Sequence, residues 1–123
     1  EKLLSILKLQ PVVPVLIVDD AASAVPLARA LVAGGLKAIE ITLRTPAALD
    51  AIRAVAAEVE GANVGAGTIL NAKDYEAAAA AGSTFIVSPG LNKKPRTIPA
   101  CRCFPVPPLQ AKSWRCATRA TGF

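Results

Sequence analysis

Four short apolar runs recur along the chain at nearly even spacing, and longer segments of mixed polarity separate them. The runs cover residues 12–18, 38–43, 63–67 and 84–88. Runs of this length that are rich in Val and Ile are typical of buried strands, because β-branched side chains pack well on a pleated surface. The pattern therefore predicts four strands, preceded by a short helix at the N-terminus.

The first and third of the separating segments carry signals for helix ends. Residues 21–35 finish with a glycine pair that suits a helix C-cap. Pro26 lies inside this segment and predicts either a late helix start or a kink. Residues 71–82 open with Asn71 as the expected cap and close at Gly82.

The middle segment, residues 45–61, has the strongest predicted start. Thr45 is the expected N-cap, and Pro46 stands at the first helical position, where its missing N–H costs nothing. Four apolar residues are expected on one buried face of this helix: Leu49, Ile52, Ala56 and Val59.

Strands that alternate with helices indicate an α/β fold with parallel strands and right-handed crossovers. Both a doubly wound sheet and a (β/α)₈ barrel fit this spacing. A barrel needs eight units and about 200 residues or more. The 123 residues of this chain hold four units, so the barrel alternative corresponds to half a barrel.

Polar residues and glycines gather where the predicted strands end. Glu40 and Arg44 lie in and just after the second strand, Gly65–Thr68 closes the third, and Ser88–Gly90 closes the fourth. In parallel α/β folds the carboxyl ends of the strands form the active-site edge. We therefore expect a site at this edge.

Glu40 is the candidate acid/base. It alternates in phase with Ala38 and Thr42, whereas Ile39, Ile41 and Leu43 form the opposite, helix-facing set, so Glu40 is expected to point into a barrel mouth. Burial disfavours the charged carboxylate and raises its pKa toward the range useful for proton transfer. The structural alternative is an ion pair with Arg44 or Lys37.

Arg44 and Thr68 are the candidate anion-binding residues. Arg44 is able to hold a carboxylate or phosphate with two hydrogen bonds, although an exposed arginine at a helix start is an equally open interpretation. In Gly65–Thr68 the glycines permit close backbone approach, and Thr68 offers a hydroxyl and an N–H to an anion. By itself, this segment is also consistent with a simple tight turn.

Composition changes abruptly after residue 92. Residues 1–92 hold seven Lys or Arg and nine Asp or Glu, a net charge of −2, whereas residues 93–123 hold seven Lys or Arg and no acid. All three cysteines and five of the ten prolines also lie in residues 93–123. A basic tail invites a nucleic-acid interpretation, but Trp114 alone makes no stacking platform, and we expect no nucleic-acid partner.

The same sequence also disfavours a metal-binding protein, a membrane protein and a secreted protein. The chain has no histidine, and the Cys101/Cys103 pair lacks a second ligand pair, so we expect no metal and no cofactor. No apolar run approaches the ~20 residues that span a bilayer, and no signal peptide is recognisable. A cytoplasmic protein of one domain with no membrane partner is expected.

Taken together, these segments resemble the 2-keto-3-deoxy-6-phosphogluconate (KDPG) / 4-hydroxy-2-oxoglutarate (KHG) aldolase family. The resemblance runs in order from about residue 3 to residue 92. It rests on the blocks Glu40–Thr45 (Glu-Ile-Thr-Leu-Arg-Thr) and Gly65–Leu70 (Gly-Ala-Gly-Thr-Ile-Leu), followed by Ser88–Gly90. It implies a (β/α)₈ barrel of the TIM type, with only the first four βα units present in residues 1–92.

The resemblance also implies an activity: cleavage of a phosphorylated keto acid to pyruvate, without a metal, through a lysine Schiff base. By matching motif, Glu40 corresponds to the catalytic acid/base, Arg44 and Thr68 bind the anionic ends of the substrate, and Pro89 shapes the wall of the site. A homotrimer is the implied assembly. The Schiff-base lysine of the family lies in a Lys-Phe/Leu-Phe-Pro block that this chain does not contain.

We interpret residues 93–123 as family sequence translated out of frame. Starting each codon one base earlier permits Val-Pro-Leu-Leu-Pro-Gly from the codons around Cys101–Val106, which is the fifth-strand sequence of the family. The same shift permits Ser-Glu-Ile-Met near Trp114. One missing base near Lys93 accounts for both. The alternative to an aldolase is then a non-catalytic remnant or small-anion-binding domain.

Overall fold

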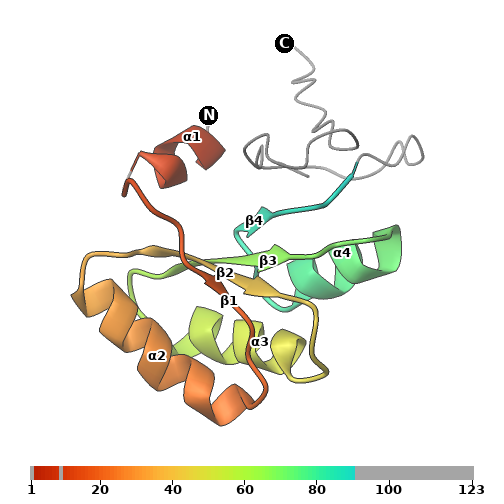
Figure 1. Cartoon of the computed structure of the whole chain (residues 1–123), viewed down its shortest axis with the longest axis horizontal. Coiled ribbons are helices and arrows are strands. Elements are labelled where there is room, and N and C mark those ends of the chain that lie inside the picture. The colour runs from red at the N-terminus through yellow and green to blue at the C-terminus, as the bar shows by residue number, and fades with distance from the viewer. Residues whose placement is uncertain (1, 9, 91–123) are drawn as a thin grey trace.

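A four-stranded parallel sheet forms the centre of the fold, in the strand order β1-β2-β3-β4 (Figure 1). The structure is a computed structural model that describes residues 2–8 and 10–90. The strands are β1 (Val15–Leu16), β2 (Ala38–Thr42), β3 (Asn63–Gly67) and β4 (Phe85–Ile86). The prediction of four parallel strands is confirmed, although β1 and β4 are shorter than their apolar runs.

Helices connect successive strands, as the pattern predicts. The connecting helices are α2 (Ala21–Ala33), α3 (Ala48–Glu58) and α4 (Ala72–Ala80), and the short helix α1 (Lys2–Leu7) precedes β1. The sequence interpretations that concern residues 93–123, including the cysteines and Trp114, lie outside the described residues. No helix in the described part of the chain is long and apolar enough to cross a membrane.

One face of the sheet packs against α2, α3 and α4, and this helical face holds the larger core. Ile39 and Ile41 of β2 are fully buried there, and Leu43 packs against them while partly exposed. The helices contribute mainly small or branched residues to this core: Ala24, Val25, Ala28, Ala51, Ile52, Val55 and Ala78. The predicted helix-facing set of β2 is confirmed.

The opposite face, which we call the inner face, is covered at its amino end by α1. Ile6 of α1 packs in a second cluster with Ala38, Phe85 and Val87. Gln10, just after α1, fixes this segment to the start of β2. Its side-chain amide donates to Ala38 O at 2.8 Å, and its carbonyl accepts from Ala38 N at 2.7 Å. The amino end of the inner face is therefore closed.

The predicted ends of α2 and α4 are largely confirmed. Asn71 caps α4 by accepting a hydrogen bond from Asp74 N at 2.9 Å. Gly34 is the C-cap of α2, and Gly35 follows with φ 90°. The late start suggested by Pro26 is wrong. Because Asp20 caps Ala22 N at 3.0 Å, α2 begins at Ala21 and accommodates the proline in its interior.

The predicted start of α3 is wrong. This helix begins at Ala48, and its N-cap Ala47 has no capping side chain. The Thr45 hydroxyl donates instead to Val18 O, which ties the end of β2 to the segment after β1. On the predicted buried face, Ile52 and Val59 are buried and Leu49 is partly buried, but Ala56 is exposed. Val55 takes its place in the core.

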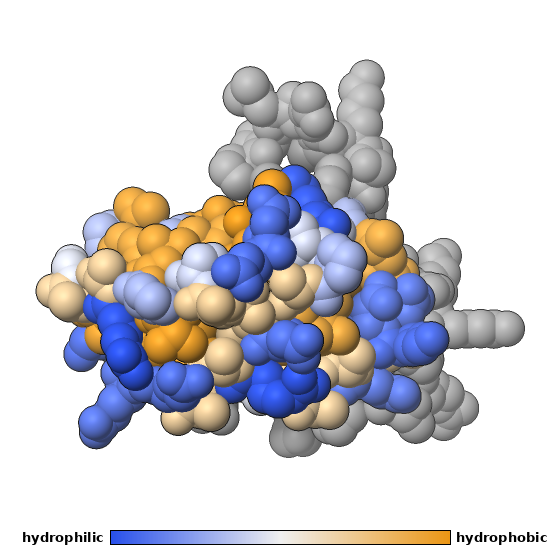
Figure 2. Space-filling view, turned by 90° about the horizontal axis from the view of Figure 1, so that it is seen from below, coloured by the Kyte–Doolittle hydropathy of each residue, from blue (hydrophilic) through white to orange (hydrophobic). Residues whose placement is uncertain are grey.

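Several large apolar side chains remain at the surface. They include Val15 of the edge strand β1 and Ile17 just after it, which are 58% and 57% exposed. Seen from below the view of Figure 1, apolar residues gather toward one side of the molecule and hydrophilic residues cover much of the rest (Figure 2). Val15 is the register partner of Glu40, so its side chain points to the same face of the sheet, away from α2, α3 and α4.

Candidate active site

Glu40 lies in the middle of β2 on the inner face of the sheet. Its neighbours Ile39 and Ile41 point to the helical core, so the alternation of the strand directs Glu40 to the other side. The residue is only 9% exposed. The prediction that a carboxylate within this strand faces away from the helices is confirmed.

The strands flanking Glu40 surround it with groups that carry no charge. In the strand register, Val15 of β1 and Gly65 of β3 are its Cα partners, and Gly65 is in turn the partner of Phe85. On the inner face β3 presents two glycines, Gly65 and Gly67. The Glu40 side chain leans over Gly67, and the Phe85 ring lies over Gly65. This strand therefore supplies space rather than side chains.

Burial raises the pKa of the Glu40 carboxyl above its ordinary value of 4.5, and the nearby Arg44 guanidinium partly opposes this rise. The structural alternative of an ion pair is not supported. Within residues 2–8 and 10–90 the ion pairs are Arg29–Glu58 and Asp50–Arg53, and neither includes Glu40. Its carboxylate also accepts no hydrogen bond from the described residues. The group is thus held in an apolar setting that favours its protonated form.

Arg44 stands at the carboxyl edge of the sheet, two residues after β2, and its side chain is exposed. The backbone on either side of it is anchored. Leu43 N donates to Gly67 O at 2.8 Å, and the Thr45 hydroxyl donates to Val18 O. The loop that carries Arg44 is therefore fixed to both neighbouring strand ends while the guanidinium remains available to an anion.

Thr68 follows β3 directly and adopts a left-handed backbone conformation, with φ 62°. A threonine rarely adopts this conformation, and such backbone strain tends to be retained at functional sites. Its neighbour is fixed, because Ile69 N donates to Val87 O at 3.2 Å. Thr68 itself is half-buried at the same edge as Arg44.

Pro89 belongs to the loop after β4, and this loop is tied to the one after β3. The Ser88 hydroxyl lies 2.7 Å from Ile69 O and 2.8 Å from Gly90 O, so it is able to donate to either carbonyl. Pro89 is half-buried. The four residues proposed from sequence therefore lie in the middle of β2 (Glu40) or in the loops that follow β2, β3 and β4 (Arg44, Thr68 and Pro89).

Two structural contributors were not singled out from the sequence. Thr42 Oγ1 donates to Leu16 O at 3.0 Å and links β2 to β1 beside the site. Phe85 forms the apolar wall over Gly65, and only the strand register reveals that proximity. In the described residues no group of three or more His, Cys, Asp or Glu is placed to hold a metal ion.

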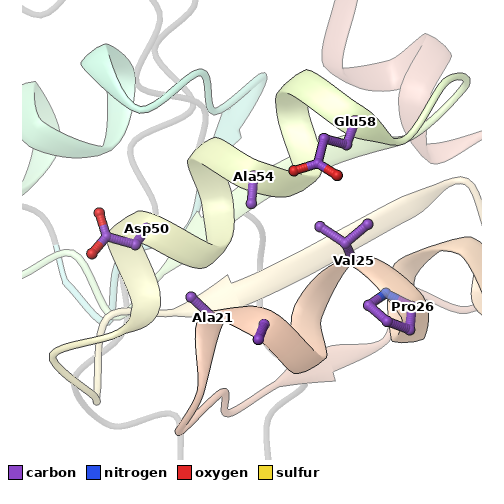
Figure 3. A pocket seen from close by; sticks show the side chains of 7 residues that line it. Ala21, Val25, Pro26, Asp50, Ala54 and Glu58 are labelled. Atoms are coloured by element: carbon purple, nitrogen blue, oxygen red, sulfur yellow. The ribbon is translucent and has the colours of Figure 1, made fainter.

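A separate groove of about 520 Å³ lies between α2 and α3. Figure 3 shows Val25 and Pro26 on one wall and Asp50, Ala54 and Glu58 on the other. Both helices cover the face of the sheet opposite to Glu40. This groove is therefore distinct from the candidate site.

The fold and the site define a class: a parallel α/β protein of the TIM-barrel type with a buried carboxylate on its inner face. The family model for the KDPG and KHG aldolases matches residues 3–107. The chain belongs to this aldolase family. The recognition made from the sequence motifs is confirmed.

Two curated relatives illustrate the similarity. The chain is 59% identical over 88 residues to the 2-dehydro-3-deoxy-phosphogluconate aldolase of Zymomonas mobilis, an alignment covering 72% of this chain and 42% of the relative. It is 54% identical over 89 residues to the KHG/KDPG aldolase of Escherichia coli, covering 72% of this chain and 42% of that protein. The chain thus spans less than half the length of these relatives.

Solved structures of KDPG aldolases also superpose on this chain. The Zymomonas mobilis KDPG aldolase with 3-phosphoglycerate superposes with a TM-score of 0.68 at 58% identity, covering 72% of this chain and 42% of that one. The Legionella pneumophila KDPG aldolase, captured with pyruvate as a covalent carbinolamine, superposes with a TM-score of 0.69 at 36% identity, covering 72% and 43%. The predicted TIM-type barrel fold is confirmed, and the described residues contain four of its parallel strands and the three helices between them.

Proposed function

We propose that residues 1–92 are the N-terminal half of a Schiff-base aldolase that cleaves KDPG to pyruvate and glyceraldehyde 3-phosphate, KHG to pyruvate and glyoxylate, or both. The observation that supports this most directly is the buried Glu40 on the inner face, with its raised pKa and without an ion-pair partner among the described residues. A carboxyl group whose protonated form is stabilised by burial is suited to take up and return protons during a reaction.

In the proposed reaction, a lysine amine adds to the substrate ketone and expels water to form an iminium. Loss of the proton from the C4 hydroxyl then breaks the C3–C4 bond, and the bonding electrons move into the iminium to give an enamine. Protonation of the enamine and hydrolysis release pyruvate. Glu40 is the proposed acid/base that shuttles protons in these steps, because burial raises its pKa and so favours uptake of a proton.

Arg44 and Thr68 are the proposed anion-binding residues of this site. The exposed guanidinium of Arg44 is able to hold a carboxylate or phosphate. Thr68 offers its hydroxyl and backbone N–H to the pyruvyl carboxylate, and Pro89 limits the site at the end of β4. The pyruvate and 3-phosphoglycerate in the Legionella and Zymomonas structures support ligands of this chemistry.

The full reaction needs a lysine that the motif pattern does not supply here. We propose that residues 93–123 derive from a shifted reading frame, and that this chain is catalytically inactive for that reason. A remnant that binds small anions through Arg44 and Thr68 is the second candidate, favoured by the absence of the lysine block from the sequence. The homotrimer and the cytoplasmic location implied by the family remain proposals for the full-length parent.

Two experiments test this assignment. Borohydride reduction of the chain with radiolabelled pyruvate is expected to trap no adduct, whereas a trapped adduct would show a working lysine in this chain. Resequencing the DNA from codon 88 onward is expected to restore one base near codon 93 and open a Lys-Phe/Leu-Phe-Pro block. The repaired chain should then release pyruvate from KDPG or KHG in an assay coupled to lactate dehydrogenase, and failure on both substrates would overturn the proposed function.

A further inference from the structure

Gly67 lies against Glu40 so closely that no side chain fits between them. An ideal Cβ at Gly67 would lie 2.8 Å from Cδ of Glu40 and 3.1 Å from Cγ, with Oε1 closer still. Real Cβ atoms do not approach other atoms to that extent, so the carboxylate occupies the volume that any other residue at position 67 would fill. The backbone of Gly67 is fixed there, because its carbonyl accepts from Leu43 N at 2.8 Å.

We propose that Gly67 is a positioning residue for the candidate acid/base: the absence of a side chain at this position reserves the space in which the Glu40 carboxylate sits. This inference deepens the proposed function and rests on the role of Glu40 in it. Neither glycine on the inner face of β3 has positive φ. The requirement for glycine at position 67 is therefore one of space and not of backbone conformation.

The two glycines of β3 differ in the side chain that an added Cβ would meet, so the proposed positioning role applies to Gly67 and not to Gly65. A Cβ at Gly65 would overlap the ring of Phe85, which is rigid and 3% exposed. A Cβ at Gly67 would meet only the far end of the flexible Glu40 side chain among its nearest atoms. Alanine at position 67 is therefore expected to displace the carboxylate and preserve the fold, whereas alanine at position 65 disturbs the packing.

The direction of the effect follows from the surroundings of Glu40. The groups facing it from β1, β3 and β4 carry no charge, and Arg44 at the end of β2 is the cation acting on it. Since desolvation is the leading cause of the raised pKa, pushing the carboxylate out of its buried position lowers the pKa toward 4.5.

The test is a carbon-detected NMR titration of the Glu40 carboxyl in the full chain and in its Gly67→Ala variant, with Gly90→Ala as the matched control. A Cβ at Gly90 meets nothing within 4 Å, so the control should titrate like the unmodified chain. The expected result is a lower Glu40 pKa in Gly67→Ala. A pKa that is unchanged or higher would overturn the proposal.

If Gly67→Ala does not fold, the thermal stability of the double variant Gly67→Ala/Glu40→Ala tests the same proposal. With the Glu40 side chain removed, the overlap disappears, and the double variant is expected to melt like Glu40→Ala alone. A double variant as destabilised as Gly67→Ala would show that β3 needs glycine for another reason. Neither measurement requires turnover. A positive result together with failure of the repaired chain to cleave KDPG and KHG would therefore overturn the proposed function and leave the positioning role standing.

Discussion

The side-chain amide of Gln10 pairs with both backbone groups of Ala38, accepting from its N–H at 2.7 Å and donating to its carbonyl at 2.8 Å. This is the pairing that an additional strand would make with the first residue of β2. Gln10 is 7% exposed, so water does not replace these bonds readily. A single side chain thus completes the sheet where the backbone of β1 does not reach.

Replacing Gln10 by leucine is expected to reduce the free energy of unfolding by about 1–3 kcal/mol, because Ala38 N and O lose their partner in a buried place. Chemical denaturation followed by far-UV circular dichroism measures the change. Gln10→Glu is the informative companion, since it keeps one acceptor for Ala38 N but loses the donor to Ala38 O. Equal stability of the leucine variant and the unmodified chain would contradict this role.

Glu40→Gln is expected to stabilise the chain in a pH-dependent manner. The folded-state pKa of Glu40 is raised above 4.5, so the folded state binds the proton more tightly than the unfolded state. Stability therefore falls as pH rises from about 4.5 through the folded pKa, and it is constant above that pKa. The glutamine variant has no carboxyl group at position 40, so it does not lose stability over this pH range. Its advantage should be largest at pH values above the folded-state pKa and vanish below 4.5, as measured by urea denaturation across pH.

Arg44→Gln should raise the pKa of Glu40 further, because the guanidinium is the group that lowers it. The carboxyl titration observed by NMR measures the change, and added salt should reduce the difference between the two proteins. Arg53→Gln is the matched control, since Arg53 pairs with Asp50 on α3. A shift of equal size in the control would show that net charge, rather than the position of Arg44, is responsible.

Gly65→Ala is expected to destabilise the fold by about 1–3 kcal/mol, the usual cost of forcing additional volume into a packed region. The reason is overlap with the buried Phe85 ring. Thermal unfolding measures the loss, and combining the change with Phe85→Leu should recover part of it. No recovery in the double variant would locate the strain elsewhere in β3.

Thr45→Val is expected to cost about 1 kcal/mol, because the hydroxyl that bonds Val18 O is lost while the shape of the side chain is preserved. Thr45→Ser retains the hydroxyl and should be close to neutral in the same denaturation experiment. If serine costs as much as valine, the methyl group rather than the hydrogen bond holds the strand ends together.

Residues whose role follows from local pattern could be predicted from the sequence. The inward direction of Glu40 needed only the alternation of β2, and the Asn71 cap needed only its place before an amphipathic run. Thr45 shows where local signals fail. Its hydroxyl fits an N-cap by sequence, but a carbonyl from the segment after β1 competes for it, and α3 begins later.

Contacts that depend on the register between strands could not be predicted. The sequence indicates that the Gly65–Thr68 segment permits a close approach, but not that Glu40 approaches Gly67 while Phe85 approaches Gly65. Gln10 is a similar case, because its partner is 28 positions away in the chain. These contacts require the tertiary arrangement, which no periodicity encodes.

The strand order β1-β2-β3-β4 follows the order of the chain, so each strand pairs with the strand synthesised just before it. A nascent polypeptide leaving the ribosome can therefore add one βα unit at a time to a sheet that already exists, without waiting for distant sequence. Within the described residues, every strand pairing of β1, β2 and β3 is made with a segment that precedes residue 90. These pairings are therefore all available to a nascent chain as soon as β4 has left the ribosome.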